Sequence, residues 1–376
     1  MTTLGDVTKL LHTWYPPATA ESWDAVGLVY GDPADEVRKV MFAVDPTEEV
    51  AAEAADWGAD LLVVHHPLFL KPVHGFAATS PKGRALATLV KAGCGLLTAH
   101  TNADQAVDGV SDALARALGL EDIKPILPTA ATALDQLVVY VPADAVAPLR
   151  AALSEAGAGA LGNYDHCSFS SPGEGRFRPL PGAEPTIGTI GVIEIVPEVR
   201  VEVVFPRSRR TAVVEAMIAA HPYEYPAHQV SELVDSGAGE IGTGRRGVVP
   251  LTTLGDFIQL VSQALPETVH GVRAAGDWDR EVRRVAVCGG AGDFLLDRLV
   301  TSDIDVYLTS DLRHHRAAEF IEGRGPALID VAHWAAEWTW LPVVQTKLTE
   351  ALGVAGGDTV ETHVSTLCTD PWTTRI

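Results

Sequence analysis

The sequence predicts an α/β protein in which both chain ends form one duplicated domain, built on mixed or parallel sheets, with a ferredoxin-like α+β domain inserted between them. Three observations carry this prediction. Apolar strands alternate with helices in both outer thirds, the order of elements changes in the middle, and stretches rich in glycine and proline separate the thirds. We expect residues 1–125 and 251–376 to be the two halves of one domain and 126–250 to be the insert.

Length and composition indicate a folded protein with two cores. The chain has 376 residues, 47% hydrophobic and 20% charged, about twice the usual length of one domain. No apolar run approaches the ~20 residues of a membrane span, and the N-terminus lacks the pattern of a secretion signal. Four scattered cysteines form no C-x-x-C pair, which argues against disulfides and a thiolate zinc site. We expect a cytoplasmic protein without membrane association.

The charge balance disfavours nucleic acid as a partner. Lys and Arg total 28 and Asp and Glu total 49, which gives a formal net charge of −21. Such a surface repels phosphate backbones. The most basic stretch, 199–210, is interpreted as a strand end with solvated arginines. The excess of carboxylates and the 13 histidines leave room for divalent metal.

In the first third, short apolar runs alternate with helices. The run LLVV at 61–64 is wholly apolar, which is typical of a strand covered on both faces. Strand, helix, strand, helix, strand is the order of βαβ units and predicts a parallel sheet. The expected strands are 37–44, 61–64 and 95–100, and the expected helices are 48–60 and 83–93.

The middle third has a different order, β-α-β-β-α, which is typical of a ferredoxin-like module. The stretch 157–185 is rich in glycine, proline and serine, and no element is assigned to it. The expected strands are 134–141, 187–195 and 199–205, and the expected helices are 144–157 and 210–221.

The last third returns to alternation and resembles the first. In both, a short strand is followed by a helix and a second strand, and the second strand ends in His-x-x-x-Asp or His-x-x-x-Glu. We interpret this as a weak internal duplication, although helix–strand alternation alone produces part of the likeness. The expected strands are 282–292, 305–311 and 326–333, and the expected helices are 255–265, 294–302 and 314–325.

Histidines and carboxylates gather where these strands end. His65 and His66 follow the buried run 61–64, and the carboxyl ends of parallel strands are where α/β sheets place ligands. Both side chains can converge only if the chain turns there, and Pro67 favours a non-helical His66. The alternative is one buried, hydrogen-bonded histidine and one exposed histidine.

Two further pairs follow two other strands. Asp104, four residues after His100, would lie at the same sheet edge as His65; alternatively, it begins a helix as its N-cap. His333 and Glu337 share one face if the chain turns helical, whereas a surface His/Glu pair is common without a metal.

Together the three strand ends supply three histidines and two carboxylates. Such a nitrogen and oxygen set suits zinc, manganese, iron or magnesium, and five ligands exceed what one tetrahedral zinc needs. The sequence therefore predicts two divalent metal ions, with Asp104 and Glu337 bridging or clamping them. Two glycine-rich stretches look like phosphate loops but lack the full motifs. These stretches are GTGRRG at 242–247 and VCGGAGD at 287–293.

Several motifs, in order along both outer thirds, resemble those of the Nif-three-like dinuclear metal proteins, known in bacteria as GTP cyclohydrolase I type 2 homologues. The middle third resembles the PII/CutA-like insert of the longer members, through AAHPYEYPAHQV (219–230) and the GTGRRG exit. The motifs of the outer thirds are HHP (65–67), HTNAD (100–104), AHWAAE (332–337), SWDAVGLVYGD (22–32), AVDPT (43–47), VAVCGGAG (285–292) and TSDLRHH (309–315).

The resemblance implies a homohexameric toroid, a dimer of trimers, with metal sites that face an internal cavity. This sequence departs from the family's pattern at Ala25, where the family often has Asn, and at Ser310, where it has Gly. In the insert, Tyr225 and His228 replace the usual Glu and Tyr. The family's metal ligands fall on His65, His66, Asp104, His333 and Glu337.

These observations favour a metal-dependent hydrolase with a metal-bound water as the only identified catalytic group. The resemblance implies GTP as the small-molecule substrate, with its imidazole ring opened, although phosphoester hydrolysis uses the same chemistry. The alternative is a non-enzymatic, metal-binding toroidal scaffold or interaction protein. Asp45, His100, Asp311 and His315 are candidates for orienting ligands or substrate.

Overall fold

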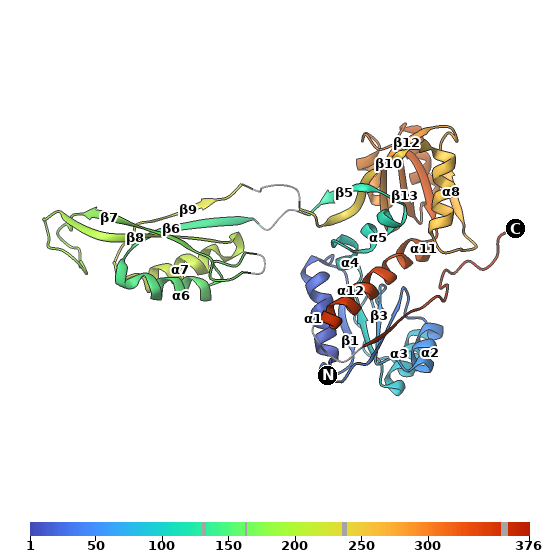
Figure 1. Ribbon diagram of the computed structural model, residues 1–376, viewed down its shortest axis with the longest axis horizontal. Helices are drawn as coiled ribbons and strands as arrows, with labels where there is room; N and C mark the ends of the chain where they lie inside the picture. Colours follow the sequence, from blue (N-terminus) through green and yellow to red (C-terminus); the bar gives the residue numbers. More distant parts are fainter. Residues whose placement is uncertain (130–132, 162–163, 235–238, 355–359) are drawn as a thin grey trace. The chain divides into compact units, whose positions relative to one another are not determined.

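The computed structural model describes residues 1–129, 133–161, 164–234, 239–354 and 360–376. Its contacts divide the chain into two compact units (Figure 1). Unit 1 consists of Met1–Thr129 and Glu240–Ile376, and unit 2 of Ala130–Gly239. The sequence-based boundaries near 125 and 250 lie inside strands of unit 1, because β5 (Glu121–Pro128) pairs with β10 (Gly242–Thr253).

The first sheet of unit 1 contains the strands that were expected in the first third. Its order is β1-β4-β3-β2-β15, in which β2, β3, β4 and β15 are parallel and β1 is antiparallel. The prediction of a parallel sheet here is confirmed. The strands are β1 (Gly27–Tyr30), β2 (Lys39–Ala43), β3 (Leu61–Val64), β4 (Gly95–Thr98) and β15 (Glu361–Val364).

Helices cover both faces of this sheet, as the wholly apolar β3 predicts. Leu61 and Val63 pack with α1 (Leu4–Trp14), and α12 (Trp340–Val354) belongs to the same cluster. Leu62 and Val64 point to the opposite face, where α2 (Glu48–Trp57) and α3 (Pro81–Ala92) pack (Figure 1). Alternate side chains of β3 therefore pack in two separate apolar cores, one on each face of the sheet.

The second sheet of unit 1 has the order β11-β14-β13-β12-β10-β5. Its centre, β12, β13 and β14, is parallel, whereas β5, β10 and β11 pair antiparallel. The fold of unit 1 is therefore mixed α/β. The new strands are β11 (Val272–Ala275), β12 (Glu281–Ala291), β13 (Val306–Ser310) and β14 (Ala327–Val331).

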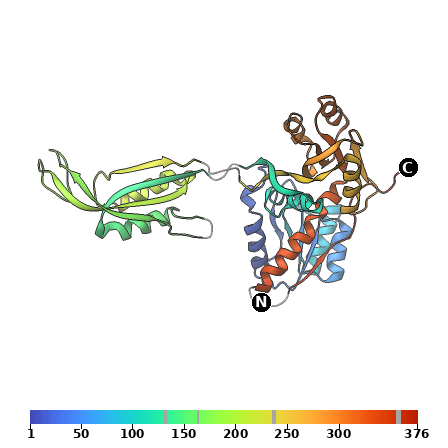
Figure 2. The ribbon, with the colours of Figure 1, turned by 45° about the horizontal axis from the view of Figure 1, so that its top comes forward.

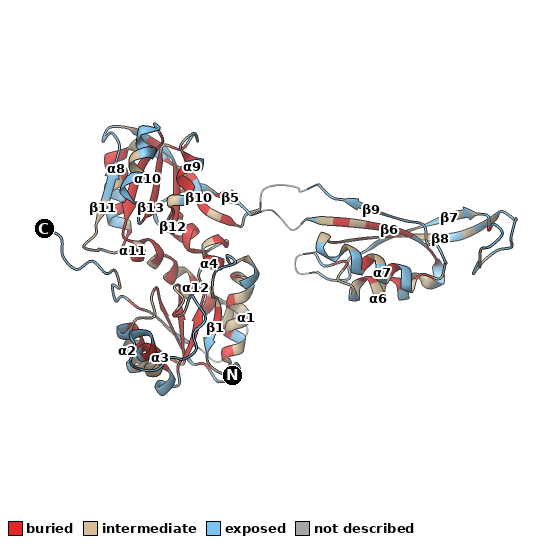
Figure 3. Cartoon of the chain, turned by 180° about the vertical axis from the view of Figure 1, so that it is seen from behind, coloured by how far each residue is buried: buried red, intermediate tan, exposed pale blue. Residues whose placement is uncertain are grey.

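One apolar cluster joins the two sheets and so ties the chain ends together. It contains Phe42 and Val63 of the first sheet, Val287 and Leu308 of the second, and Trp340 of α12. In Figure 3 these strands are mostly coloured as buried. The other helices of unit 1 are α4 (Thr101–Gln105), α5 (Val110–Ala117), α8 (Leu254–Ala264), α9 (Leu296–Leu299), α10 (His314–Glu322) and α11 (His333–Trp338), with the 3₁₀ turns Pro17–Thr19 and Asp293–Leu295.

Unit 2 is an antiparallel sheet with two helices on one face. The strand order is β7-β8-β6-β9, and α6 and α7 lie on one side of the sheet (Figures 1 and 2). These helices bury Leu149 and Met217 against Leu137, Val139 and Val201. The elements are β6 (Leu134–Pro142), α6 (Val146–Glu155), β7 (Phe169–Phe177), β8 (Glu194–Pro206), α7 (Arg210–Ala220) and β9 (His228–Glu232), with the 3₁₀ turns Ala143–Ala145 and Arg207–Arg209.

One strand prediction in unit 2 was wrong, and one strand was missed. The expected strand 199–205 lies inside β8, but residues 187–193 of the expected strand 187–195 form no strand. The missed strand is β7, which lies in the glycine- and proline-rich stretch. An edge strand tolerates Pro172 and two glycines because only one of its sides is paired. Ile190 and Val192 are about half exposed, so their apolar character marks no core strand.

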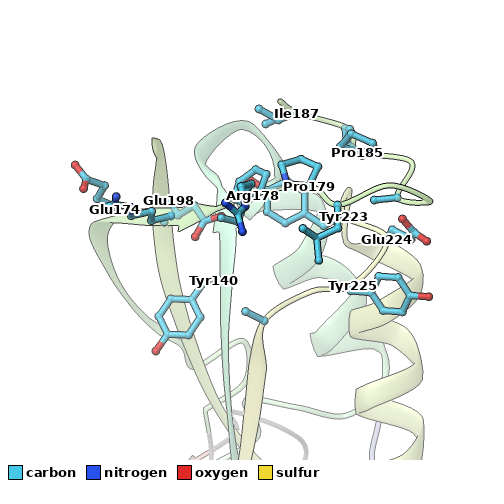
Figure 4. Close-up of a pocket in the computed structure, with 17 residues that line it drawn as sticks. Tyr140, Glu174, Arg178, Pro179, Pro185, Ile187, Glu198, Tyr223, Glu224 and Tyr225 are labelled. Atoms are coloured by element: carbon cyan, nitrogen blue, oxygen red, sulfur yellow. The ribbon is translucent and has the colours of Figure 1, made fainter. Parts of the chain in front are cut away.

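A pocket of about 610 Å³ lies in unit 2 (Figure 4). Its lining includes Tyr140 of β6, Phe177 of β7, Glu198 of β8 and the loop residues Tyr223 and Tyr225. The hydroxyl of Tyr223 is buried and has no hydrogen-bond partner among the described residues. Tyr225, which differs from the family's pattern, is exposed at the rim of this pocket.

All four cysteines are free thiols, with Cys94 and Cys288 buried. Among the described helices, none combines the length and the apolar character that a bilayer crossing requires.

Candidate metal centre

Three strand ends of unit 1 carry the candidate ligands to one place. His65 and His66 follow β3, α4 after β4 carries Asp104, and α11 after β14 carries His333 and Glu337. The chain bends at the end of β3, where the amides of His65 and His66 both donate to Val44 O. As a result, the two adjacent imidazoles lie side by side, with 5.0 Å between ring centroids.

Glu337 lies at the centre of the group. His333 Nε2 is 2.8 Å and His65 Nε2 is 3.4 Å from Glu337 Oε1, and His66 Nε2 is 3.1 Å from Oε2. Asp104 Oδ1 lies 3.6 Å from His65 Nε2. His333 and Glu337 are one helical turn apart on α11, as the i, i+4 spacing predicted. The five predicted residues therefore converge.

The other ring nitrogen of each of these three histidines is held by an oxygen. His65 Nδ1 donates to Ala99 O at 2.9 Å. His66 Nδ1 donates to Asp45 Oδ1 at 2.7 Å, and His333 Nδ1 donates to Asp311 Oδ2 at 2.6 Å. This arrangement turns each Nε2 inward, as in metal sites where a carboxylate or carbonyl fixes a histidine ligand. Asp45 and Asp311 thus contact ligand candidates, as predicted.

His100 lies close enough to His65 and His66 to be a ligand candidate itself, in addition to a candidate for orienting other ligands. Its ring centroid is 5.1 Å from that of His65 and 5.5 Å from that of His66. Ligand atoms within 4.8 Å of one another form two groups, which share His66. One is His65, His66 and His100, and the other is His66, His333 and Glu337.

Asp24 supports His100, a contact that the sequence did not predict. Its buried carboxylate accepts from His100 Nδ1 at 2.8 Å and from the amide of Thr101 at 3.0 Å. Burial raises the pKa of Asp24, but hydrogen bonds from His100 and Thr101 outweigh it and lower the pKa. The motif around Trp23 and Asp24 was visible in the sequence, but its partner is 76 residues away.

His315 does not belong to the centre. It lies at the start of α10, is exposed, and its ring packs against His314 at 5.2 Å. Within the described residues it makes no hydrogen bond or ion pair with the five ligand candidates. The first turn of α10 directs His315 to solvent, so it orients none of the ligand candidates here, and its predicted role towards substrate stays a prediction.

Burial and charge make the centre suitable for cations. Glu337 is 3% exposed and His65 is fully buried. Within the described structure, His65 Nε2, Asp104 Oδ1 and Glu337 Oε2 are buried without a hydrogen-bond partner. Such orphaned polar atoms cost stability unless another group satisfies them. Their nitrogen and carboxylate set fits a divalent metal of the first row or magnesium.

The ionisation of the centre follows from the same contacts. Burial raises the pKa of Glu337, but the three histidines around it lower the pKa well below its usual range. Glu337 in turn raises the pKa of His333 to about 11. Burial lowers the pKa of His66, but Glu337 and Asp45 together raise it to about 10. Glu337 is therefore ionised, and its negative charge faces the three imidazoles.

A glycine completes the wall of the centre. A Cβ on Gly290 would lie 2.6 Å from Glu337 Oε1 and 3.2 Å from His333 Nε2. Gly290 also has a φ of +68°, which L-residues rarely adopt. The backbone of the stretch VCGGAGD (287–293) therefore approaches the ligand candidates closely.

This chain is similar in sequence to known proteins along nearly its whole length. A protein of Mycobacterium leprae named GTP cyclohydrolase 1 type 2 homolog is 49% identical over 373 residues, 98% of this chain and 94% of that protein. A Bacillus subtilis protein of the same name is 39% identical over 330 residues, 88% of this chain and 87% of that protein.

Solved structures are also similar. A Bacillus cereus protein related to NIF3 shares 37% identity with a TM-score of 0.75 and covers 98% of each chain. Staphylococcus aureus SA1388 shares 29% identity with a TM-score of 0.80 and covers 99% of each chain. The family model of Duf34/NIF3 (NGG1p interacting factor 3) matches residues 2–371. This chain therefore belongs to the Duf34/NIF3 family.

Proposed function

We propose that the chain is a dinuclear-metal-dependent hydrolase that acts on a nucleotide or another phosphoester. The convergence of three imidazole Nε2 atoms and two carboxylates on one buried point supports this proposal. The donors are His65, His66, Asp104, His333 and Glu337, and a ring nitrogen of His100 lies within 4.8 Å of ring nitrogens of His65 and His66. Six donors are more than one four-coordinate ion needs, which favours two ions.

The residues divide the work of the centre. His65, His66 and His333 would bind metal through Nε2 as neutral imidazoles, since Nδ1–H of each donates to an oxygen and a bound cation would displace any proton on Nε2. Glu337 contacts all three histidines and would help to hold both ions. Two bound divalent ions supply Lewis acidity and lower the pKa of water towards neutrality. Asp45 and Asp311 keep the imidazoles in the binding orientation.

The proposed substrate follows the name of the relatives, GTP cyclohydrolase 1 type 2 homolog. GTP is therefore the first nucleotide to test, with hydrolytic opening of its imidazole ring as the expected reaction. A pocket of about 720 Å³ includes His66 and Asp45 in its lining, and its volume is sufficient for a small-molecule substrate.

The test is turnover by purified protein reconstituted with zinc, manganese, iron or magnesium. GTP and a panel of phosphoesters are offered, and products are followed by chromatography. We expect metal-dependent hydrolysis that His333→Ala abolishes. His166→Ala is the matched control, because this exposed histidine belongs to unit 2, and it is expected to retain full activity. Metal binding without turnover of any substrate would favour a toroidal metal-binding scaffold instead.

The assembly and the domain arrangement complete the proposal. We propose a homohexameric toroid, measurable by light scattering as a mass six times that of the 39.8 kDa chain. Unit 1 is proposed to be an internal duplication, and unit 2 an inserted ferredoxin-like domain of the PII/CutA type.

Removal of unit 2 is expected to leave the metal centre intact. The two chain ends of the gap lie close together, because the amide of Thr129 donates to Ile241 O at 2.9 Å. Replacing residues 130–239 with a short glycine linker should therefore preserve β5, β10 and the centre. We expect the same metal content per chain as in the full protein, measured by elemental analysis together with circular dichroism. An unfolded or metal-free product would contradict the insertion.

A further inference from the structure

The glycine-rich stretch at 242–247 contains an arginine in the interior of unit 1. Arg245 is 1% exposed and belongs to β10. Its Nε donates to Asp112 Oδ1 of α5 at 2.6 Å. A buried guanidinium is stable only when its charge and all its donors are satisfied. The partners of Arg245 therefore show what this side chain holds in place.

The remaining donors of Arg245 all bind main-chain carbonyls. Nη1 donates to Gly242 O at 2.6 Å and to Gly244 O at 2.8 Å. Nη2 donates to Ala106 O at 2.7 Å and to Gln105 O at 3.2 Å. With the bond to Asp112, the five N–H groups of the guanidinium have five acceptors. Lysine offers three donors from one point and cannot reproduce this fork.

Two of these carbonyls belong to the end of α4, which carries Asp104. α4 has five residues, too few to be a stable helix by itself. The last carbonyls of any helix lack partners within the helix, and a cation there is favourable. Arg245 supplies both the donors and the charge at Gln105 and Ala106, directly after Asp104. At the other end of α4, Asp24 accepts from the amide of Thr101.

The loop between α4 and α5 is fixed by the same pair. Asp112 Oδ2 accepts from the amide of Asp108 at 2.8 Å, while its Oδ1 accepts from Arg245. The Arg245–Asp112 pair thus connects β10, the end of α4 and the start of α5. The short helix α4 places Asp104 Oδ1 3.6 Å from His65 Nε2. This oxygen is buried and has no hydrogen-bond partner among the described residues.

We propose that Arg245 is a positioning residue for the metal centre. By holding the carboxyl end of α4, it keeps Asp104 directed at the ligand histidines and so sets the affinity for divalent cations. This inference rests on the proposed metal centre. Residues that orient a metal ligand typically contribute ten- to hundredfold to metal affinity.

The test uses three variants of the full chain. Arg245→Lys keeps the charge and removes the fork. The double variant Asp112→Leu/Arg245→Met removes both charges and fills their space, because replacing a whole buried ion pair often preserves stability. Arg246→Lys is the matched control, since its side chain is exposed one residue further along the same strand.

Two measurements separate positioning from general destabilisation. Zinc affinity is measured by competition with a chelator, and hydrogen exchange of residues 101–108 is measured on metal-free protein. We expect Arg245→Lys and the double variant to bind zinc about 10- to 100-fold more weakly, with faster exchange in α4. Arg246→Lys should match wild type in both. Val261→Ala, a core substitution in α8, controls for lost stability and should leave zinc affinity within about twofold.

The outcomes distinguish this inference from the function on which it rests. Wild-type protein that binds no zinc would remove the metal centre itself. Wild type that binds zinc, with Arg245→Lys and the folded double variant equally tight and α4 exchange unchanged, would overturn the positioning role alone. So would an equal loss of affinity in Val261→Ala, because the effect would then follow stability and not α4.

Discussion

Glu337→Gln is expected to reduce bound metal from two ions per chain to at most one, with hydrolysis lost alongside. The substitution keeps the shape of the side chain but removes the negative charge that faces three histidines within 3.4 Å. Two divalent cations in one buried site repel each other, and a bridging carboxylate offsets that repulsion. The amide can still offer one oxygen, so partial occupancy by one ion is expected.

The measurement is metal per chain by elemental analysis after equilibration at matched protein and free-metal concentrations. Glu322→Gln, at the exposed end of α10, is the control and should bind like wild type. His333→Ala removes one neutral ligand from one ion. It should therefore reduce the occupancy of that ion more than the occupancy of the other. Wild type with no more than one ion at saturating metal would refute the dinuclear centre. Two ions retained by Glu337→Gln would assign the bridge to Asp104.

Trp340→Ala is expected to destabilise unit 1 by roughly 3–5 kcal/mol, the cost of truncating a large buried aromatic side chain. Trp340 is fully buried at the start of α12, in the cluster that both sheets share. Its Nε1 donates to Tyr15 OH at 3.1 Å, which connects α12 with the end of α1. Its ring centroid lies 5.7 Å from that of His65, so the cavity would also loosen the metal centre.

Urea unfolding of the metal-free protein, followed by circular dichroism, measures this change. Trp340→Phe keeps most of the apolar volume and loses the hydrogen bond, so a loss of roughly 1–2 kcal/mol is expected. Trp372→Ala, at a position 65% exposed, should change stability by less than about 0.5 kcal/mol. A Trp340→Ala protein as stable as Trp372→Ala would show that the two halves do not depend on this shared core.

Much of the fold of unit 1 could be predicted because its signals are local. The run LLVV is buried on both faces as β3, with the bounds that its apolar length indicates. Parallel strands place their carboxyl ends on one edge of a sheet. The sequence alone was therefore enough to predict that five residues form one site: His65, His66, Asp104, His333 and Glu337. Local signals failed for β7, whose proline and glycines are tolerated only because the strand lies at an edge.

The sequence by itself determined which strand ends carry imidazoles and carboxylates, and that these residue types suit divalent metal. Only the tertiary structure showed that Asp24 contacts His100 and that Arg245 binds the end of α4. The partners His100 and Asp24 are 76 residues apart, and Arg245 lies 139 residues from Ala106. Hydrophobic periodicity reports which face of an element is buried, but not what it is buried against. Orientation of the ligands therefore depends on long-range packing that no single stretch of the chain encodes.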